Sequence, residues 1–215
     1  MIKKIMDVIN GPQKENITAE DLLGSGIDKI ISLDDLVRPK EPDLRVMGLF
    51  SDVSEEKVAE LIHAMLYLNE TNIINSKEEP IEFYISTYGG SADDMFGMYD
   101  VMRFIRESTE IHTFGLGKVM SAGVLLLAAG TKGKRRIGKN CRVMIHSVIG
   151  GNHGPLHNLI NEMEAVEQIQ KMYSRALIKE TNMSKKDLKD LLERKVNVYL
   201  SAEEAVDLGI ADIIV

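Results

Sequence analysis

Residues 117–135 read GKVMSAGVLLLAAGTKGKR, and this stretch decides the fold. Within it, Ser121–Ala129 predicts a short apolar helix that ends at Gly130, because glycine commonly follows the last helical turn. Ile111–Leu116, just before it, has the β-branched and aromatic composition of a strand, and Gly115–Gly117 predicts a loop between strand and helix. The stretch therefore predicts a strand, a tight connection and a helix.

The same alternation of strand and helix continues on both sides of this stretch. Upstream, Ile81–Ser86 predicts a strand that breaks at Gly89-Gly90, and the apolar spacing over Met95–Ile105 predicts a helix. Downstream, Cys141–His146 predicts another strand. Because strands that alternate with helices pair mainly in parallel, we expect an α/β fold with a mainly parallel sheet.

Four further segments complete the expected architecture. Ser54–Asn69 spaces its apolar residues by three and four, as one face of a helix requires. Pro155–Asn182 is the longest helical pattern, and its apolar stripe exceeds what a small domain needs for its own core, so we expect it to contact a partner subunit. Residues 201–204 (SAEE) have the spacing of a capping box that opens a short helix ending near Gly209, and Ile210–Val215 predicts a final strand.

The composition is that of one globular domain. The chain has 215 residues, of which 44% are hydrophobic and 27% charged, so it can bury a sizeable core. A formal net charge of −7 argues against nucleic-acid binding, which draws on a basic surface. We place the domain at residues 28–215 and interpret residues 1–27 as an N-terminal arm, which is either mobile or a propeptide or axial gate. The start lacks an apolar signal segment, and no apolar run approaches the roughly 20 residues of a membrane span, so we expect a cytoplasmic protein without membrane contact.

Ser121 and His146 are the candidate reactive pair. Ser121 stands where the predicted loop meets the helix, so its hydroxyl lies near backbone N–H groups that favour a developing oxyanion. A serine at such a place is more commonly a helix N-cap. His146 ends a predicted strand beside Gly150-Gly151, and imidazole titrates near neutral pH, as a base for serine requires. Taken alone, His146 also fits a structural hydrogen-bonded role, but one helix and one strand separate the two residues, which allows their ends to meet.

The remaining candidate residues give weaker evidence of a functional site than Ser121 and His146 do. Gly89-Gly90 either exposes backbone N–H groups to a substrate carbonyl or forms a plain strand-to-helix turn. Cys141 lies in an apolar run and fits a buried hydrophobic side chain better than a catalytic thiol. The other histidines lie within a helix or strand or flank Gly154-Pro155, without regular ligand spacing, so we expect no metal site; they are His63, His112, His153 and His157.

The motifs together resemble one known family. Residues 117–135 closely resemble the nucleophile segment of the ClpP family of serine peptidases, and residues 142–146 (RVMIH) with Gly150-Gly151 resemble its histidine segment. The resemblance extends from about residue 30 to the end of the chain, and includes Tyr88–Ser91 and Tyr199–Gly209. It implies the ClpP/crotonase-like fold, with repeated β-β-α units, a mainly parallel sheet head and a long protruding handle helix.

The resemblance also implies roles for individual residues. Ser121 attacks a peptide carbonyl, His146 takes its proton, and the backbone N–H groups of Gly89 and Ala122 hold the oxyanion. The substrate-binding residues are Gly90, Gly150 and Gly151. The peptidase needs no cofactor. The expected assembly is two stacked heptameric rings of the same chain, served by an AAA+ unfoldase of the ClpX, ClpA or ClpC type that delivers unfolded polypeptides.

This sequence departs from the family pattern at the acidic member of the triad. The family has an Arg-Asp-Thr-Asp-type stretch there, whereas residues 192–198 read LERKVNV. We expect Glu193 to take the place of the aspartate, since a carboxylate one methylene longer can still orient His146. Asn197 is the alternative, able to orient the ring without neutralising it. Residues 86–90 (STYGG) also replace the family's Asn-Ser-Pro-Gly-Gly, and residues 1–27 match no recognisable propeptide or axial gate.

Two other functions compete with an active, self-compartmentalised serine endopeptidase. The altered acidic stretch is also what a catalytically impaired ring subunit with a structural or regulatory role would show. An acyl-CoA enzyme of the related crotonase fold would likewise hold an oxyanion with paired backbone N–H groups. The Ser121 and His146 pair favours the peptidase.

Overall fold

The computed structural model describes residues 44–151, 153–192 and 197–215. The predicted arm over residues 1–27 lies outside them, and Leu44–Val215 form one compact unit. The strands are β1 (Val46–Leu49), β2 (Ile81–Thr87), β3 (Ile111–Met120), β4 (Arg136–Ile137), β5 (Arg142–Ile145), β6 (Val198–Leu200) and β7 (Ile213–Ile214). The helices are α3 (Glu55–Asn75), α4 (Ala92–Ile105), α5 (Ala122–Ala128), α6 (Leu156–Glu180), α7 (Lys185–Leu192) and α8 (Ala202–Asp207).

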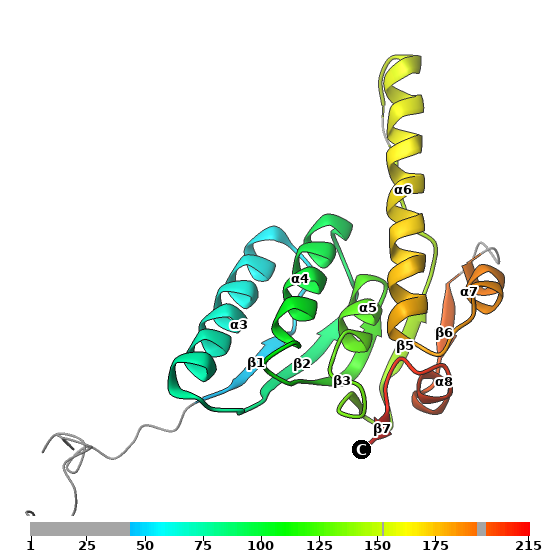
Figure 1. Ribbon diagram of the computed structural model, residues 1–215. Coiled ribbons are helices and arrows are strands. Elements are labelled where there is room, and N and C mark those ends of the chain that lie inside the picture. The colour runs from blue at the N-terminus through cyan, green and yellow to red at the C-terminus, as the bar shows by residue number, and fades with distance from the viewer. Residues whose placement is uncertain (1–43, 152, 193–196) are drawn as a thin grey trace, which may run out of the picture. The chain divides into compact units, whose positions relative to one another are not determined.

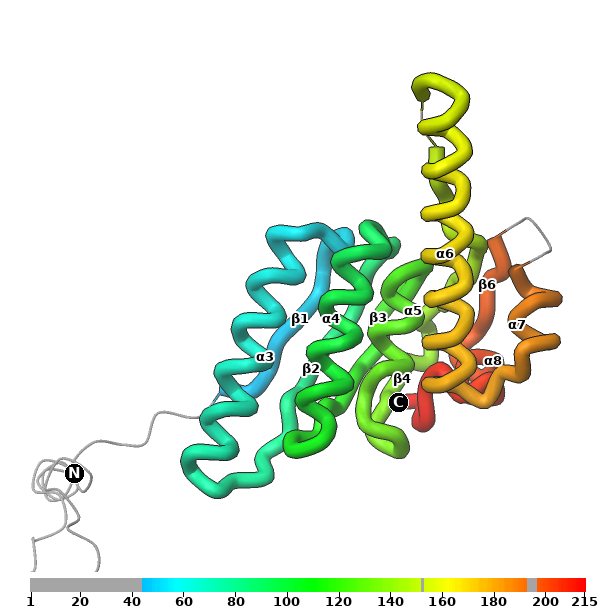
Figure 2. The backbone as a smooth tube through the Cα atoms, turned by 45° about the horizontal axis from the view of Figure 1, so that its top comes forward, coloured from blue at the N-terminus to red at the C-terminus, as the bar shows by residue number. Residues whose placement is uncertain are grey.

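The strands form one mainly parallel sheet, as expected. Strands β1, β2, β3, β4 and β7 follow one another in this order, and β5 pairs with β3 and β6. Every pairing is parallel except that of β5 with β6. Helices α3, α4 and α5 cover the same face of the sheet (Figures 1 and 2). The α/β prediction is confirmed.

Strand β3 organises the sheet because it pairs with three other strands. Phe114, in its first half, lies opposite Arg136 of β4, whereas Lys118, near its end, lies opposite Arg142 of β5. Between these points Gly117 has a positive φ of 62°, which a glycine adopts without steric cost. The predicted loop at Gly115–Gly117 is therefore wrong: these residues belong to β3, and the bend at Gly117 marks where the strand changes partners.

The core lies between the sheet and its helices. Ile81, Phe83 and Ile85 of β2 are fully buried and alternate with partly exposed residues, as a strand with one covered face requires. All residues of α5 are buried, which explains why its sequence is apolar on every side. Helix α5 therefore lies in the core, and Ser121 stands directly before it.

The predicted helix over Ser54–Asn69 continues six residues further, to Asn75. Its last two turns contain buried polar residues that no apolar stripe reveals. Asn69 accepts hydrogen bonds from Ser108 and Thr109, and Asn72 donates to the backbone carbonyl of Glu79 at 2.8 Å. The helix thus continues because tertiary partners hydrogen-bond to Oδ1 of Asn69 and to Nδ2 of Asn72. Four short elements, β1, β4, β6 and α7, also went unpredicted.

Helix α6 confirms the longest predicted helix and protrudes from the body of the molecule (Figure 1). Its C-terminal turns are packed on the core, where Tyr173 and Leu177 are buried. Toward its other end, Leu156 and Met163 are each 68% exposed. No helix in the described part of the chain is long and apolar enough to cross a membrane.

Candidate active site

Ser121 occupies the sharp turn between β3 and α5. Its backbone has φ 53° and ψ −121°, and Ser76 is the only other non-glycine residue with a positive φ among those described. Such a conformation costs a residue with a Cβ atom on the order of 1 to 3 kcal/mol, so the surrounding structure must hold it. The side chain makes no N-cap hydrogen bond. Instead, its Oγ lies 2.9 Å from Nε2 of His146.

Neighbouring strands bring Ser121 and His146 together. Strands β3 and β5 pair in parallel, with Met120 opposite Met144, and the Ser121 N–H donates to the Met144 carbonyl at 2.8 Å. Ser121 follows the last residue of β3, and His146 follows the last residue of β5. The carboxyl ends of parallel strands lie at the same edge of a sheet, where α/β proteins commonly place reactive groups.

Both residues line one cavity of about 490 Å³. One part of its wall is polar, with Ser91 beside Ser121 and His146. The rest carries large apolar or aromatic side chains, which are Tyr88, Met95, Val148, Ile149, Ile169 and Tyr173. A cavity with a reactive pair and an apolar wall has the character of a substrate-binding site.

The backbone N–H groups around Ser121 differ from the prediction in one respect. Gly89 donates its N–H to Oγ1 of Thr87 at 3.0 Å, so this group is occupied. The N–H groups of Gly90 and Ala122, which both line the cavity, donate to no acceptor in the described part of the chain. Gly89 instead serves close packing, because a Cβ atom on it would lie 2.6 Å from Cβ of Ser121.

Gly150 and Gly151 lie apart from this group. They line a different cavity, together with Met163 and Val166 of α6. A Cβ atom on Gly150 would lie 2.5 Å from a methyl group of Val166. The structure thus brings Gly89, Gly90, Ser121, Ala122 and His146 together but leaves Gly150 and Gly151 along the protruding helix.

The predicted acidic member of the site, Glu193, lies outside the described residues. Nδ1 of His146 makes no hydrogen bond to any described residue. On the side before residue 193, the Leu192 carbonyl accepts a hydrogen bond of 2.8 Å from Oγ of Ser147. On the far side, Val198 lies opposite Ile145 in the antiparallel ladder of β6 and β5. Ile145 and Ser147, the two neighbours of His146, therefore contact residues on either side of positions 193–196.

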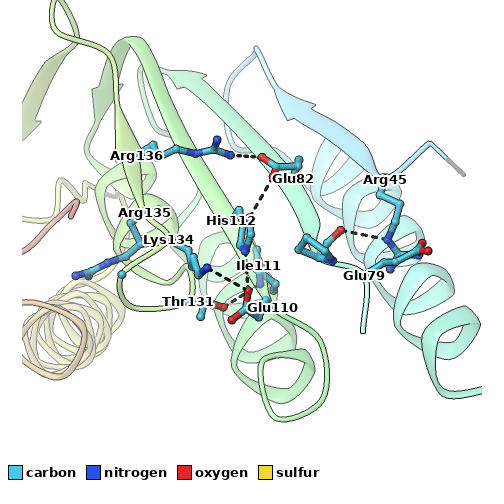
Figure 3. A network of polar contacts seen from close by, with 12 residues as sticks. Arg45, Glu79, Glu82, Glu110, Ile111, His112, Thr131, Lys134, Arg135 and Arg136 are labelled. Atoms are coloured by element: carbon cyan, nitrogen blue, oxygen red, sulfur yellow. Dashed lines mark hydrogen bonds and ion pairs between the residues drawn. The ribbon is translucent and has the colours of Figure 1, made fainter. Parts of the chain in front are cut away.

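The other titratable residues considered above have structural surroundings. His112 stands between two carboxylates, with Nδ1 3.1 Å from Glu82 and Nε2 2.8 Å from Glu110 (Figure 3). The hydrogen bond from His112 lowers the pKa of Glu110. Cys141 is buried, which raises its pKa to about 11 and keeps the thiol protonated near neutral pH. Across residues 44–151, 153–192 and 197–215, no group of three or more His, Cys, Asp or Glu side chains could hold a metal ion.

One residue at the site escaped sequence analysis. Tyr173 of α6 donates a hydrogen bond of 3.0 Å from its hydroxyl to the Ser121 carbonyl, and its ring lines the cavity. In the sequence Tyr173 is one member of a long apolar stripe. Since 52 positions separate it from Ser121, no local pattern links the two.

Comparison with known proteins gives one consistent result. The family model for Clp protease matches residues 42–215. The ATP-dependent Clp protease proteolytic subunit of Oltmannsiellopsis viridis is 33% identical over 168 residues, which cover 78% of this chain and 82% of the relative. The ATP-dependent Clp protease proteolytic subunit 1 from each of two Prochlorococcus marinus strains, CCMP1986 and MIT 9312, is 29% identical over 170 residues, which cover 79% of this chain and 83% of each relative.

Proposed function

The chain belongs to the Clp protease family, and we propose that it cleaves peptide bonds with Ser121 as nucleophile and His146 as general base. It is a serine-type peptidase, the proteolytic subunit of an ATP-dependent Clp protease. The distance of 2.9 Å between Ser121 Oγ and His146 Nε2 carries the residue assignment, because proton transfer needs hydrogen-bond contact. No comparable observation favours an impaired subunit.

The proposed reaction follows from this pair. Nε2 of His146 accepts the hydroxyl proton as Oγ of Ser121 bonds to the substrate carbonyl carbon, and the carbonyl oxygen becomes an oxyanion. The imidazolium then gives this proton to the leaving amine as the C–N bond breaks, which leaves an acyl ester on Ser121. A water molecule, deprotonated by His146, attacks the ester and releases the acid and the free serine.

The oxyanion needs donors that are not already engaged. We assign this role to the N–H groups of Gly90 and Ala122, because both line the cavity and neither donates to a described acceptor. This assignment replaces Gly89 by its neighbour, since the Gly89 N–H already bonds to Thr87. Donors of this kind stabilise charge that develops only in the transition state, and one such donor is worth roughly 3 to 4 kcal/mol of the barrier.

Oligomeric assembly and a Clp ATPase partner go with the proteolytic subunit of such a protease. More specifically, we propose two stacked heptameric rings, fed with unfolded polypeptides by an unfoldase of the ClpX, ClpA or ClpC type, in the cytoplasm. The protruding α6 supports ring contacts, because its exposed Leu156 and Met163 offer apolar surface that a single protomer leaves uncovered (Figure 1). Gly150 and Gly151, beside this helix, are proposed to contact substrate in the assembled chamber.

The assignment of Ser121 is tested by hydrolysis of a short fluorogenic peptide and by labelling with a fluorophosphonate. Ser121→Ala should lose both activities while keeping the assembly state of the wild type. Ser51→Ala is the matched control, because Ser51 is exposed and does not line the cavity, and should keep both. Hydrolysis or labelling that persists in Ser121→Ala would contradict the assignment.

A further inference from the structure

His146 has one ring nitrogen with an obvious partner and one without. Nε2 contacts the Ser121 hydroxyl, so Nδ1 must carry the proton when Nε2 acts as a base. An Nδ1–H group without an acceptor leaves both the tautomer and the ring orientation undefined. No described residue accepts a hydrogen bond from Nδ1, and His146 is only partly buried. The residue that orients the ring must therefore approach from beside the end of β5.

The pairing of β5 with β6 identifies the residue opposite His146. In this antiparallel ladder Val143 lies opposite Leu200, Met144 opposite Tyr199, and Ile145 opposite Val198. One step further, the same register places Asn197 opposite His146. Residues directly opposite in an antiparallel pair lie on the same face, with Cβ atoms about 4.5 to 5.5 Å apart. Asn197 lies among the described residues, is exposed, and makes no hydrogen bond to another described residue.

Leu192, at the other flank of residues 193–196, lies on the opposite side of the chain from Asn197. Consecutive side chains of an extended chain point in opposite directions. His146 lines the cavity that contains Ser121, whereas Ser147 lines a different cavity, between α6 and α7. It is Ser147 that bonds to the Leu192 carbonyl. The chain therefore leaves α7 on the side of Ser147 and returns at Asn197 on the side of His146.

We infer that Asn197, and not Glu193, is the positioning residue that holds the imidazole of His146 through Nδ1. This inference rests on the proposed function, since it assigns a role only if His146 is the general base. We expect the amide oxygen of Asn197 to accept the Nδ1–H hydrogen bond in the substrate complex, which leaves Nε2 free to accept the Ser121 proton. In free enzymes such bonds are often long and tighten when substrate binds.

An amide at this place has a chemical consequence that a carboxylate would not have. It fixes the tautomer but carries no charge, so it does not neutralise the imidazolium that forms during attack. The site is thus oriented for catalysis without electrostatic support at Nδ1. A carboxylate introduced at position 197 would stabilise the protonated ring, and the acid limb of the pH profile would then move to higher pH.

The test measures kcat and kcat/KM for a fluorogenic peptide as a function of pH. Asn197→Ala should lower kcat at least about tenfold with little change in KM, because the ring loses its orientation. Asn197→Asp should keep or raise kcat and move the acid limb of kcat/KM upward by about one pH unit. Asn75→Ala is the matched control, because Asn75 is exposed at the end of α3, far from β5 and β6 (Figure 1).

The outcomes separate this inference from the proposed function. If Ser121→Ala still hydrolyses the peptide, the proposed function itself is wrong. If Ser121→Ala is inactive but Asn197→Ala has wild-type kcat and Asn197→Asp leaves the pH profile unmoved, only the role of Asn197 is wrong. Glu193→Gln then identifies the competitor, since a loss in that variant alone would return the role to Glu193. If Asn197→Ala does not assemble, the pH profile of Asn197→Asp alone decides whether Asn197 positions His146.

Discussion

The hydroxyl of Tyr173 donates a hydrogen bond of 3.0 Å to the backbone carbonyl of Ser121. Tyr173 is only 4% exposed and belongs to the buried base of α6, so the bond joins the protruding helix to the turn of the proposed nucleophile. Burial raises the pKa of Tyr173 well above its usual range, which keeps the hydroxyl protonated and able to donate. The bond therefore helps to hold Ser121 in its positive-φ conformation.

Tyr173→Phe should lower kcat more than it changes KM, because it removes this restraint without removing the ring from the cavity wall. We expect a loss of about tenfold in kcat and about 1 kcal/mol in the free energy of unfolding, the typical value of one hydrogen bond. Peptide hydrolysis and denaturant unfolding measure the two effects. Tyr67→Phe, on the exposed face of α3, is the control, and equal kinetics in the two variants would refute the coupling.

Gly89→Ala should abolish peptide hydrolysis. Gly89 has φ 104°, and an added Cβ would lie 2.6 Å from Cβ of Ser121, so the methyl group must displace the nucleophile turn. Labelling of Ser121 by a fluorophosphonate should fall by at least about a hundredfold. Gly97→Ala adds the same methyl group within α4, where no atom beyond the adjacent residues and turns of that helix lies within 4 Å, and should label normally. A Gly89→Ala variant with normal labelling would show that the turn tolerates the displacement.

Glu180→Gln should reduce stability in a pH-dependent way. Burial raises the pKa of Glu180, but hydrogen bonds from Arg106 and Tyr99 outweigh it, so the pKa is lowered overall. A carboxylate with a lowered pKa in the folded state adds stability above its unfolded pKa of about 4.5 and loses it as the pH falls.

We therefore expect the variant to be about 3 kcal/mol less stable at pH 7, and this difference to shrink below about pH 4.5. Urea unfolding at several pH values measures it. Glu78→Gln provides the comparison, because Glu78 is exposed. A Glu180→Gln difference that stays constant down to pH 3 would mean that the carboxylate is not the source of the stability.

Met163→Asp should weaken the assembly without unfolding the protomer. Met163 is 68% exposed on the protruding part of α6, so the protomer itself loses little when its side chain becomes charged. A charge buried at an interface between copies would be unpaired and costly. Size-exclusion chromatography with light scattering should show smaller species, whereas Met163→Leu should assemble normally. Unchanged assembly of Met163→Asp would remove this part of α6 from the interface.

Much of the fold could be predicted because local patterns encode it. The alternation of strands and helices indicated the parallel sheet, and the apolar stripe of residues 155–182 predicted α6. The prediction was wrong at Gly115–Gly117, where glycines suggested a loop but pairing with β4 and β5 keeps the chain in β3. Helix α3 also exceeded its prediction, since buried Asn69 and Asn72 find hydrogen-bond partners that are distant in sequence.

The sequence by itself determined which residue types were available for chemistry: a serine before an apolar helix, a histidine after a strand, and glycines near both. Their motifs were sufficient for the family. Only the tertiary structure decided how they meet, because the ends of β3 and β5 become neighbours through sheet pairing. It likewise placed Tyr173 on Ser121 and fixed the pairing of β5 with β6, whose register we extend to His146 and Asn197. Such contacts depend on distances between segments far apart in the chain, and no local spacing carries them.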